Sequence, residues 1–243
     1  MIKKFGIDFA DLNLEGYRNI NELYKQHSQL HACETLFGDW NAEIMVLAQD
    51  AANFNTFKKI KFNDDKNNPF RHTPNNRTNI NLYEVLKSLN RYNLGSYEQP
   101  NNKNCGIYYA NAIWLLKDSK DMSGAITNTK DSYVLNGKVF EATLDNLSNL
   151  KIILTLGQHS FNFAKQFFND QIIFDWHQTV NDRKVHSVNY KDSTYFICSI
   201  YHTSIRGMVA RSKLNNFLGL GALEKGLEIT KNDLKIIYNS INL

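Results

Sequence analysis

The strongest constraint on the fold is a set of four short apolar runs, each about as long as a β-strand. The runs are almost continuously hydrophobic, without the apolar–polar alternation of a half-exposed strand, and they span residues 44–48, 107–113, 151–156 and 194–200. Such runs are typical of strands buried on both faces, as in a parallel sheet. Helical patterns between them predict an α/β protein with helices on both sides of the sheet.

The helical patterns divide the rest of the chain. Apolar residues recur at helical spacing over 78–89, 160–168 and 206–218, and again near the C-terminus. The two most polar stretches, 53–79 and 118–138, are expected to be long loops. The predicted architecture is three layers, α-β-α, around a central four-stranded parallel sheet. We expect one domain over 1–243, with an N-terminal helical extension (1–42), a core (43–217) and a C-terminal helix (218–243).

Polar side chains stand where these strands end. Asp50 closes the first run, Asn111 lies near the end of the second, Gly157 follows the third, and His202 follows the fourth. Ligands of open parallel sheets bind beyond the carboxyl ends of the strands, so an acid, an amide and a histidine are expected to converge there. That combination suits hydrolysis of a small polar group.

Each of these residues also has an ordinary structural explanation. Asp50 alone is more readily a helix or turn cap, Asn111 an amide that satisfies backbone groups, and His202 a histidine bonded to a carbonyl. Gly157 begins a common strand-to-helix turn, without a complete nucleotide-binding pattern. Only their joint placement favours a functional site.

Composition narrows the class of protein further. The chain has 243 residues, enough for one substantial core, and a net charge of +4, which is compatible with nucleic acid as a partner. Cys33, Cys105 and Cys198 are scattered and match neither a disulfide framework nor a metal motif, so no metal or cofactor is expected. No apolar run reaches the ~20 residues of a membrane span. A cytoplasmic monomer is expected.

Several segments resemble motifs of the uracil-DNA glycosylase superfamily, in the same order along the chain. Ala48–Asn53 resembles the first motif of the family, Asn111–Ile113 the strand whose asparagine reads the base, and His202–Ser204 its histidine motif. The segments 78–86 and 153–157 are similar to the helix and the third buried strand of the family. The resemblance covers about residues 43–217 and lacks the cysteine set of the iron–sulfur branches.

The resemblance implies a role for each site residue. It makes Asp50 and His202 the catalytic residues, Asp50 near the sugar and His202 beside the base carbonyl. Gln49, Phe70 and Asn111 would bind the base, Phe70 by stacking. The expected partner is DNA containing a deaminated base, and the expected reaction is hydrolysis of its N-glycosidic bond.

The same resemblance directs attention to the segment after the histidine. Once a base leaves the duplex, something must fill the gap, and the segment Ile205–Met208 is the candidate wedge. Ser204, Ile205 and Arg206 are therefore expected to contact DNA. Arg211 and Lys213 are further candidates for phosphate contacts, although each is individually better explained as ordinary helix charge.

Three alternatives remain open. Ala52 stands where the best-known branch has a tyrosine that excludes thymine, so hypoxanthine, xanthine or mismatched thymine are alternative substrates. The chain is alternatively a non-catalytic nucleic-acid-binding module that keeps the fold. The third alternative is a nucleotide- or sugar-binding α/β protein with only the architecture in common.

Overall fold

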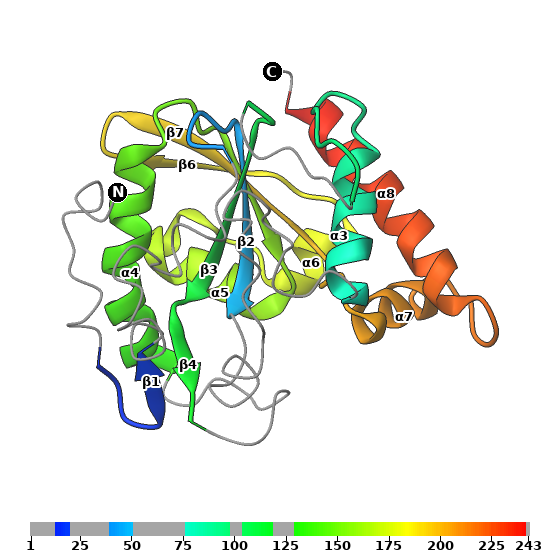
Figure 1. Ribbon diagram of the computed structural model, residues 1–243, viewed down its shortest axis with the longest axis horizontal. Coiled ribbons are helices and arrows are strands. Elements are labelled where there is room, and N and C mark those ends of the chain that lie inside the picture. The colour runs from blue at the N-terminus through cyan, green and yellow to red at the C-terminus, as the bar shows by residue number, and fades with distance from the viewer. Residues whose placement is uncertain (1–12, 20–38, 51–75, 98–103, 119–128, 242–243) are drawn as a thin grey trace.

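The computed structural model describes residues 13–19, 39–50, 76–97, 104–118 and 129–241 (Figure 1). The strands in these ranges are β1 (Tyr17–Asn19), β2 (Ile44–Asp50), β3 (Ile107–Ile113), β4 (Leu115–Lys117), β5 (Ile152–Leu156), β6 (His186–Tyr190) and β7 (Ser193–Ile200). The helices there are α3 (Arg77–Lys87), α4 (Thr129–Asn146), α5 (Gln158–Phe167), η4 (Asn169–Gln171), α6 (Trp176–Asn181), α7 (Ile205–Lys213) and α8 (Ala222–Ser240).

The main sheet confirms the predicted α/β class and corrects its details. Its strands lie in the order β3-β2-β5-β7-β6. The four predicted strands are all present and run parallel to one another, but β6 pairs with β7 in the antiparallel direction. Within the described ranges the sheet is therefore mixed and five-stranded, and the prediction of a four-stranded parallel sheet is wrong.

The missed strand β6 has the sequence His-Ser-Val-Asn-Tyr, in which buried and exposed residues alternate. His186 and Val188 are buried whereas Ser187 and Asn189 are exposed, so β6 buries only one face and lacks the continuous apolar run that marks the other four strands. A tight turn at Lys191, whose φ is 50°, joins it to β7. The polar residues on the exposed face of β6 are therefore the reason that the apolar pattern did not predict it.

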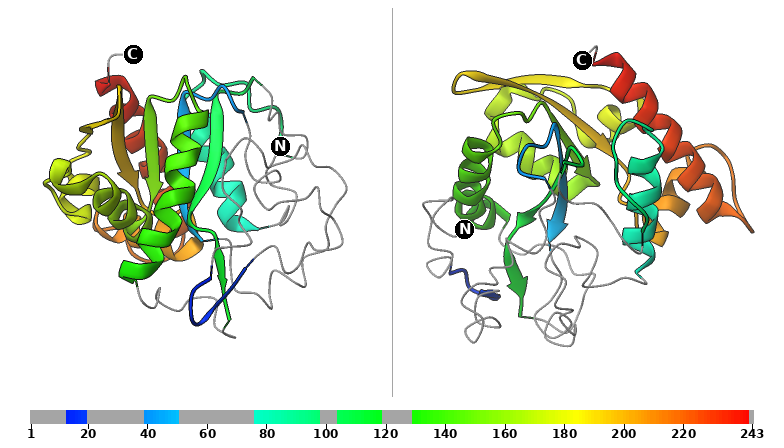
Figure 2. Two further views of the ribbon diagram at one scale, coloured as in Figure 1. Left: turned by 90° about the vertical axis from the view of Figure 1, so that its left-hand side faces the viewer. Right: turned by 45° about the horizontal axis from the view of Figure 1, so that its top comes forward.

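Helices cover both faces of the sheet, and the side chains of β2 alternate between them. Met45 and Leu47 join the core cluster that includes α4 and α5, whereas Ile44 and Val46 join the cluster that includes α3 and α8. Figure 1 shows α4 on one side of the strands and α3 with α8 on the other, and the turned views of Figure 2 agree. Burial on both faces explains why these strands are continuously apolar.

Helix α4 corrects the expected loop over 118–138, because Thr129–Asn146 is helical. Its buried face includes polar residues, among them Ser132, Asn136 and Thr143. Asn136 is fully buried, where its Oδ1 accepts from the Trp114 amide at 2.8 Å and its Nδ2 donates to the Ser132 carbonyl at 2.7 Å. A buried helix face made partly of hydrogen-bonded polar residues shows no clear apolar period, and the sequence pattern therefore missed it.

The predicted N-terminal helical extension (1–42) is wrong in the residues of that range that the structure describes. Residues 17–19 form β1, which pairs antiparallel with β4, rather than a helix. Residues 39–42 are not helical either, and 1–12 and 20–38 lie outside the described residues. Helix α8 occupies most of the expected C-terminal helix. None of the helices in the described ranges has both the length and the apolar character that crossing a bilayer requires.

Candidate functional site

The candidate site lies along the carboxyl edge of the four parallel strands. Asp50, the last residue of β2, pairs with Ile113 of β3, and Ala48 pairs with Asn111. On the other side of β2, the Gly157 amide after β5 donates to the Ile200 carbonyl of β7 at 2.9 Å. Three adjacent strands therefore end side by side with β7, and the expected convergence of strand ends is present in the backbone.

The strand order sets the spacing across this edge. Neighbouring strands lie about 4.8 Å apart, so β2 and β7, which have β5 between them, are separated by roughly 10 Å. The order across the edge is Asn111 on β3, Asp50 on β2, Gly157 after β5 and His202 after β7.

The turn after β7 determines which nitrogen of the neutral His202 ring carries the proton. The backbone amide of Ser204 donates to His202 Nδ1 at 3.2 Å. A nitrogen that accepts a hydrogen bond carries no proton, so the neutral imidazole has its proton on Nε2. In its neutral form the ring therefore carries its N–H at Nε2.

Two glycines confine the His202 backbone. A Cβ at Gly157, whose φ is +83°, would lie 3.2 Å from His202 Cβ. A Cβ at Gly207, in the first turn of α7, would overlap the His202 carbonyl oxygen. The β5–α5 turn and the start of α7 thus both approach His202 at a distance that leaves no space for a side chain.

The residues expected to contact DNA at the start of α7 differ in their exposure to solvent. Ser204 is the N-cap, and its Oγ accepts from the Gly207 amide at 3.2 Å. Ile205 and Arg206 are exposed, Ile205 to 52%. Met208 is completely buried, which removes it from the predicted wedge Ile205–Met208.

Arg211 is not available to a phosphate. It is buried, and its Nε donates to Asp233 of α8 at 2.6 Å. Arg183 donates to the other oxygen of the same carboxylate, also at 2.6 Å, and the Arg211 guanidinium lies 5.9 Å from the Tyr201 ring centroid. Arg211 therefore joins α7 to α8 and to the residue before His202. Lys213 is exposed.

Asn111 is 9% exposed and lies in the body of β3, two residues before its end. Ile107 and Tyr109, the alternate residues before it, pack in the cluster that includes α3 and α8, so Asn111 is on the same face of the strand. Gln49 is half-buried in β2. Phe70, Ala52 and the side chain of Asp50 lie outside the described residues.

One site residue was missed by the sequence analysis. Asn81 of α3 is completely buried, and its Nδ2 donates to the Thr203 carbonyl at 2.8 Å. Its only sequence signal is a polar residue four positions before the buried Val85, on the face of α3 that should be apolar. The apolar spacing alone gives no reason to connect it with His202, 121 positions away.

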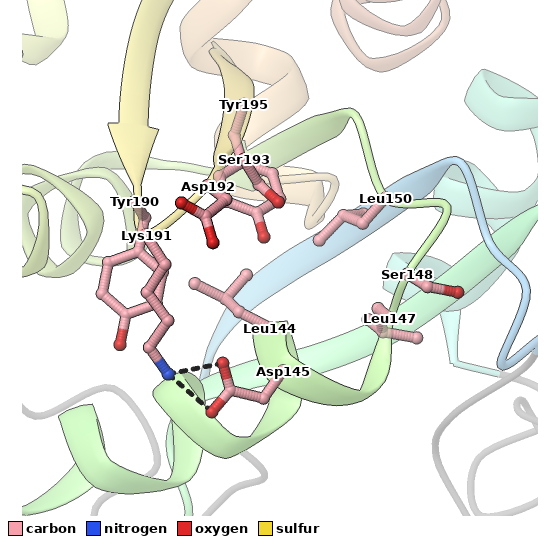
Figure 3. Close-up of a pocket in the computed structure, with 10 residues that line it drawn as sticks. All are labelled: Leu144, Asp145, Leu147, Ser148, Leu150, Tyr190, Lys191, Asp192, Ser193 and Tyr195. Atoms are coloured by element: carbon pink, nitrogen blue, oxygen red, sulfur yellow. Dashed lines mark hydrogen bonds and ion pairs between the residues drawn. The ribbon is translucent and has the colours of Figure 1, made fainter.

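A pocket of about 210 Å³ lies at the opposite edge of the sheet (Figure 3). It is formed between the α4–β5 connection and the β6–β7 turn, where the Lys191 ammonium lies 2.7 Å from Asp145. These connections precede β5 and β7, so the pocket lies at their amino ends. It is separate from the edge that carries His202.

The two cysteines in the described residues are unsuited to nucleophilic chemistry. Burial raises the pKa of the Cys198 thiol to about 12, and burial likewise raises the pKa of Cys105. Both stay protonated and are poor nucleophiles. The described residues contain no group of three side chains able to hold a metal ion.

The fold and the site define an α/β protein with an open mixed sheet, whose parallel strands bring polar residues to one carboxyl edge. Among known protein families and curated proteins, the chain has no match.

Proposed function

We propose that the protein is a DNA glycosylase that hydrolyses the N-glycosidic bond of a deaminated base, uracil, in DNA. The observation that carries this proposal is the order of Asn111, Asp50 and His202 across one strand edge, with the His202 ring set to donate from Nε2. The resemblance in sequence to the uracil-DNA glycosylase superfamily supports the same assignment.

His202 acts on the departing base. When the bond between the sugar C1′ and the base nitrogen breaks, the electron pair moves into the base and negative charge develops on its carbonyl oxygen. A neutral imidazole with Nε2–H donates a hydrogen bond to that oxygen. A donor aimed at developing charge contributes roughly 10²- to 10³-fold to the rate.

Asp50 acts on the sugar. Loss of the base leaves positive charge at C1′, and a carboxylate at the end of β2 stabilises that charge and orients the water that adds there. In this proposal Asp50 acts from the other side of the scissile bond, since β5 separates β2 from β7.

Asn111 selects the base. Its amide accepts from the ring N–H of uracil through the oxygen and donates to a uracil carbonyl through the nitrogen, a pattern that cytosine does not match. Gln49 and Phe70 complete the base pocket in this proposal, Phe70 by stacking. Because the base must first leave the duplex, the exposed Ile205 is the wedge that fills the gap.

The DNA backbone is held at the start of α7. Arg206 is exposed next to Ile205 and supplies a positive charge for a phosphate. The Ser204 oxygen accepts the cap hydrogen bond, and its hydroxyl proton is a donor for a phosphate oxygen.

Release of free base from labelled oligonucleotides tests the proposal. The panel contains uracil, hypoxanthine, xanthine, a thymine mismatch and normal duplex, each with wild type, Asp50→Asn and His202→Ala. We expect uracil release by wild type only, with both variants folded. Preferred release of another base would replace uracil as the substrate, and tight binding without any release would identify a non-catalytic module.

A further inference from the structure

The turn that carries His202 is bonded to a helix far away in the sequence. Asn81 of α3 donates from Nδ2 to the carbonyl of Thr203, the residue directly after His202, at 2.8 Å. Both residues are completely buried. This bond connects two elements that pack in the same core, and it ends one residue from the imidazole.

Two other polar atoms at this contact, the Asn81 amide oxygen and the Thr203 hydroxyl oxygen, make no hydrogen bond with the described residues. A buried acceptor without a partner costs about as much free energy as a single hydrogen bond contributes, so the side chain adds little net stability. The main consequence of the bond is therefore the placement of the Thr203 carbonyl.

Helix α3 is a rigid anchor for that carbonyl. Leu82, Val85 and Leu86 pack in the core cluster next to the sheet. Glu84 also forms an ion pair with Lys231 of α8, with 2.9 Å between Nζ and Oε2. These contacts fix α3, and with it Asn81, against the core. The hydrogen bond from Asn81 therefore holds the Thr203 carbonyl at a fixed position relative to α3.

We propose that Asn81 is a positioning residue for His202. By fixing the Thr203 carbonyl, it keeps the turn in the shape in which the Ser204 amide reaches Nδ1, so that the proton of the imidazole stays on Nε2. Gly157 and Gly207 contact the His202 backbone from the β5–α5 turn and from α7, and Asn81 holds the turn from α3. The inference rests on the proposed function, because it matters for catalysis only if His202 donates to a base.

The test compares Asn81→Leu with a matched control, Asn136→Leu. Asn136 is also a completely buried asparagine that bonds to backbone groups, but it lies on α4 at the other face of the sheet. The first readout is the ¹⁵N spectrum of the His202 ring, assigned with His202→Gln. The second is the single-turnover rate of uracil release together with the affinity for the same duplex.

We expect Asn81→Leu to move the His202 Nδ1 signal toward a mixture of tautomers and to lower the rate on the order of 10²-fold at unchanged affinity. Asn136→Leu should change neither. Asn81→Ala, which removes the same donor with a smaller side chain, supplies the test if the leucine variant does not fold. A wild-type ring spectrum in a folded Asn81 variant overturns the inference, even if the wild type releases no base. Absence of release by wild type overturns the proposed function instead.

Discussion

Asn111 shows how a single buried amide can be assigned either to the fold or to substrate selection. It is 9% exposed, lies in β3 at one edge of the main sheet, and is beside the strand that ends in Asp50. A buried donor or acceptor left without a partner costs about 1–3 kcal/mol. The choice between the two roles therefore has a measurable consequence.

We expect Asn111→Asp to lower uracil release on the order of 10- to 100-fold and to reduce the ratio of uracil to cytosine rates. The variant replaces the NH2 donor with an oxygen that repels the uracil carbonyl. Rates on matched uracil and cytosine duplexes measure it, with the denaturation midpoint recorded for each variant. Asn136→Asp is the control, which should lower the midpoint only. A lower midpoint with wild-type selectivity for Asn111→Asp assigns this residue to the fold.

At the scale of elements, α7 decides how His202 is presented. It begins at the Ser204 cap, packs Gly207 against the His202 carbonyl, and places Ile205 and Arg206 toward solvent. Its other end is joined to α8 by Arg211 and Asp233. One helix thus links the histidine, the proposed DNA contacts and the core.

Gly207→Ala is expected to shift the His202 turn, because the new Cβ would overlap a backbone oxygen. We expect loss of base release on the order of 10²-fold and a lower melting temperature. Gly137→Ala on α4 is the control. Its Cβ would lie 3.7 Å from the Phe167 ring, and alanine is favoured over glycine within a helix by about 0.5–1 kcal/mol. If the Gly207 variant releases base at the wild-type rate, α7 does not hold the turn.

The two ends of α7 should differ in their contribution to DNA binding. Arg206 lies in the first turn and Lys213 is the last residue, roughly 10 Å farther along the axis. Affinity measured by fluorescence anisotropy over a range of salt should fall for Arg206→Ala, with a salt slope smaller by about one unit. Lys213→Ala should change little. Equal effects of the two substitutions would show that the phosphate contact is misplaced.

At the scale of the whole molecule, pH acts on the fold through a buried histidine away from the site. His186 of β6 is 6% exposed, and its Nε2 lies 2.8 Å from Thr179 Oγ1 of α6. Burial, with the positive charges of Lys165 and Lys184, lowers its pKa from 6.5. The folded protein therefore holds this ring neutral at a pH where the unfolded chain protonates it.

The free energy of unfolding should fall as pH drops from 6.5 toward the lowered pKa. In that window the unfolded chain binds the additional proton, so stability rises with pH there and is fully present above 6.5. One group contributes at most about 1.4 kcal/mol per pH unit. Urea denaturation of wild type and His186→Gln over this range measures the slope. If the pH dependence of the free energy of unfolding is the same in His186→Gln as in wild type, a titratable group other than His186 causes it.

The sequence by itself determined the four parallel strands, the helices α3, α5, α7 and α8, and the order in which polar residues follow the strands. These features depend on local patterns: continuous apolar runs for strands buried on both faces, and helical spacing for α3, α5, α7 and α8. The edge strand β6 was missed because only one of its faces is buried, and the helix α4 was missed because its buried face includes hydrogen-bonded polar side chains.

Only the tertiary structure decided which of the candidate side chains are buried and which residues lie beside the His202 turn. It buried Arg211 against Asp233 and Met208 in the core, although both lie on the same helix as the exposed Arg206. It also brought Asn81 to the Thr203 carbonyl across 122 positions. A contact of that kind depends on how α3 packs against the sheet, which no local spacing records, whereas the apolar period of each element is written in its own residues.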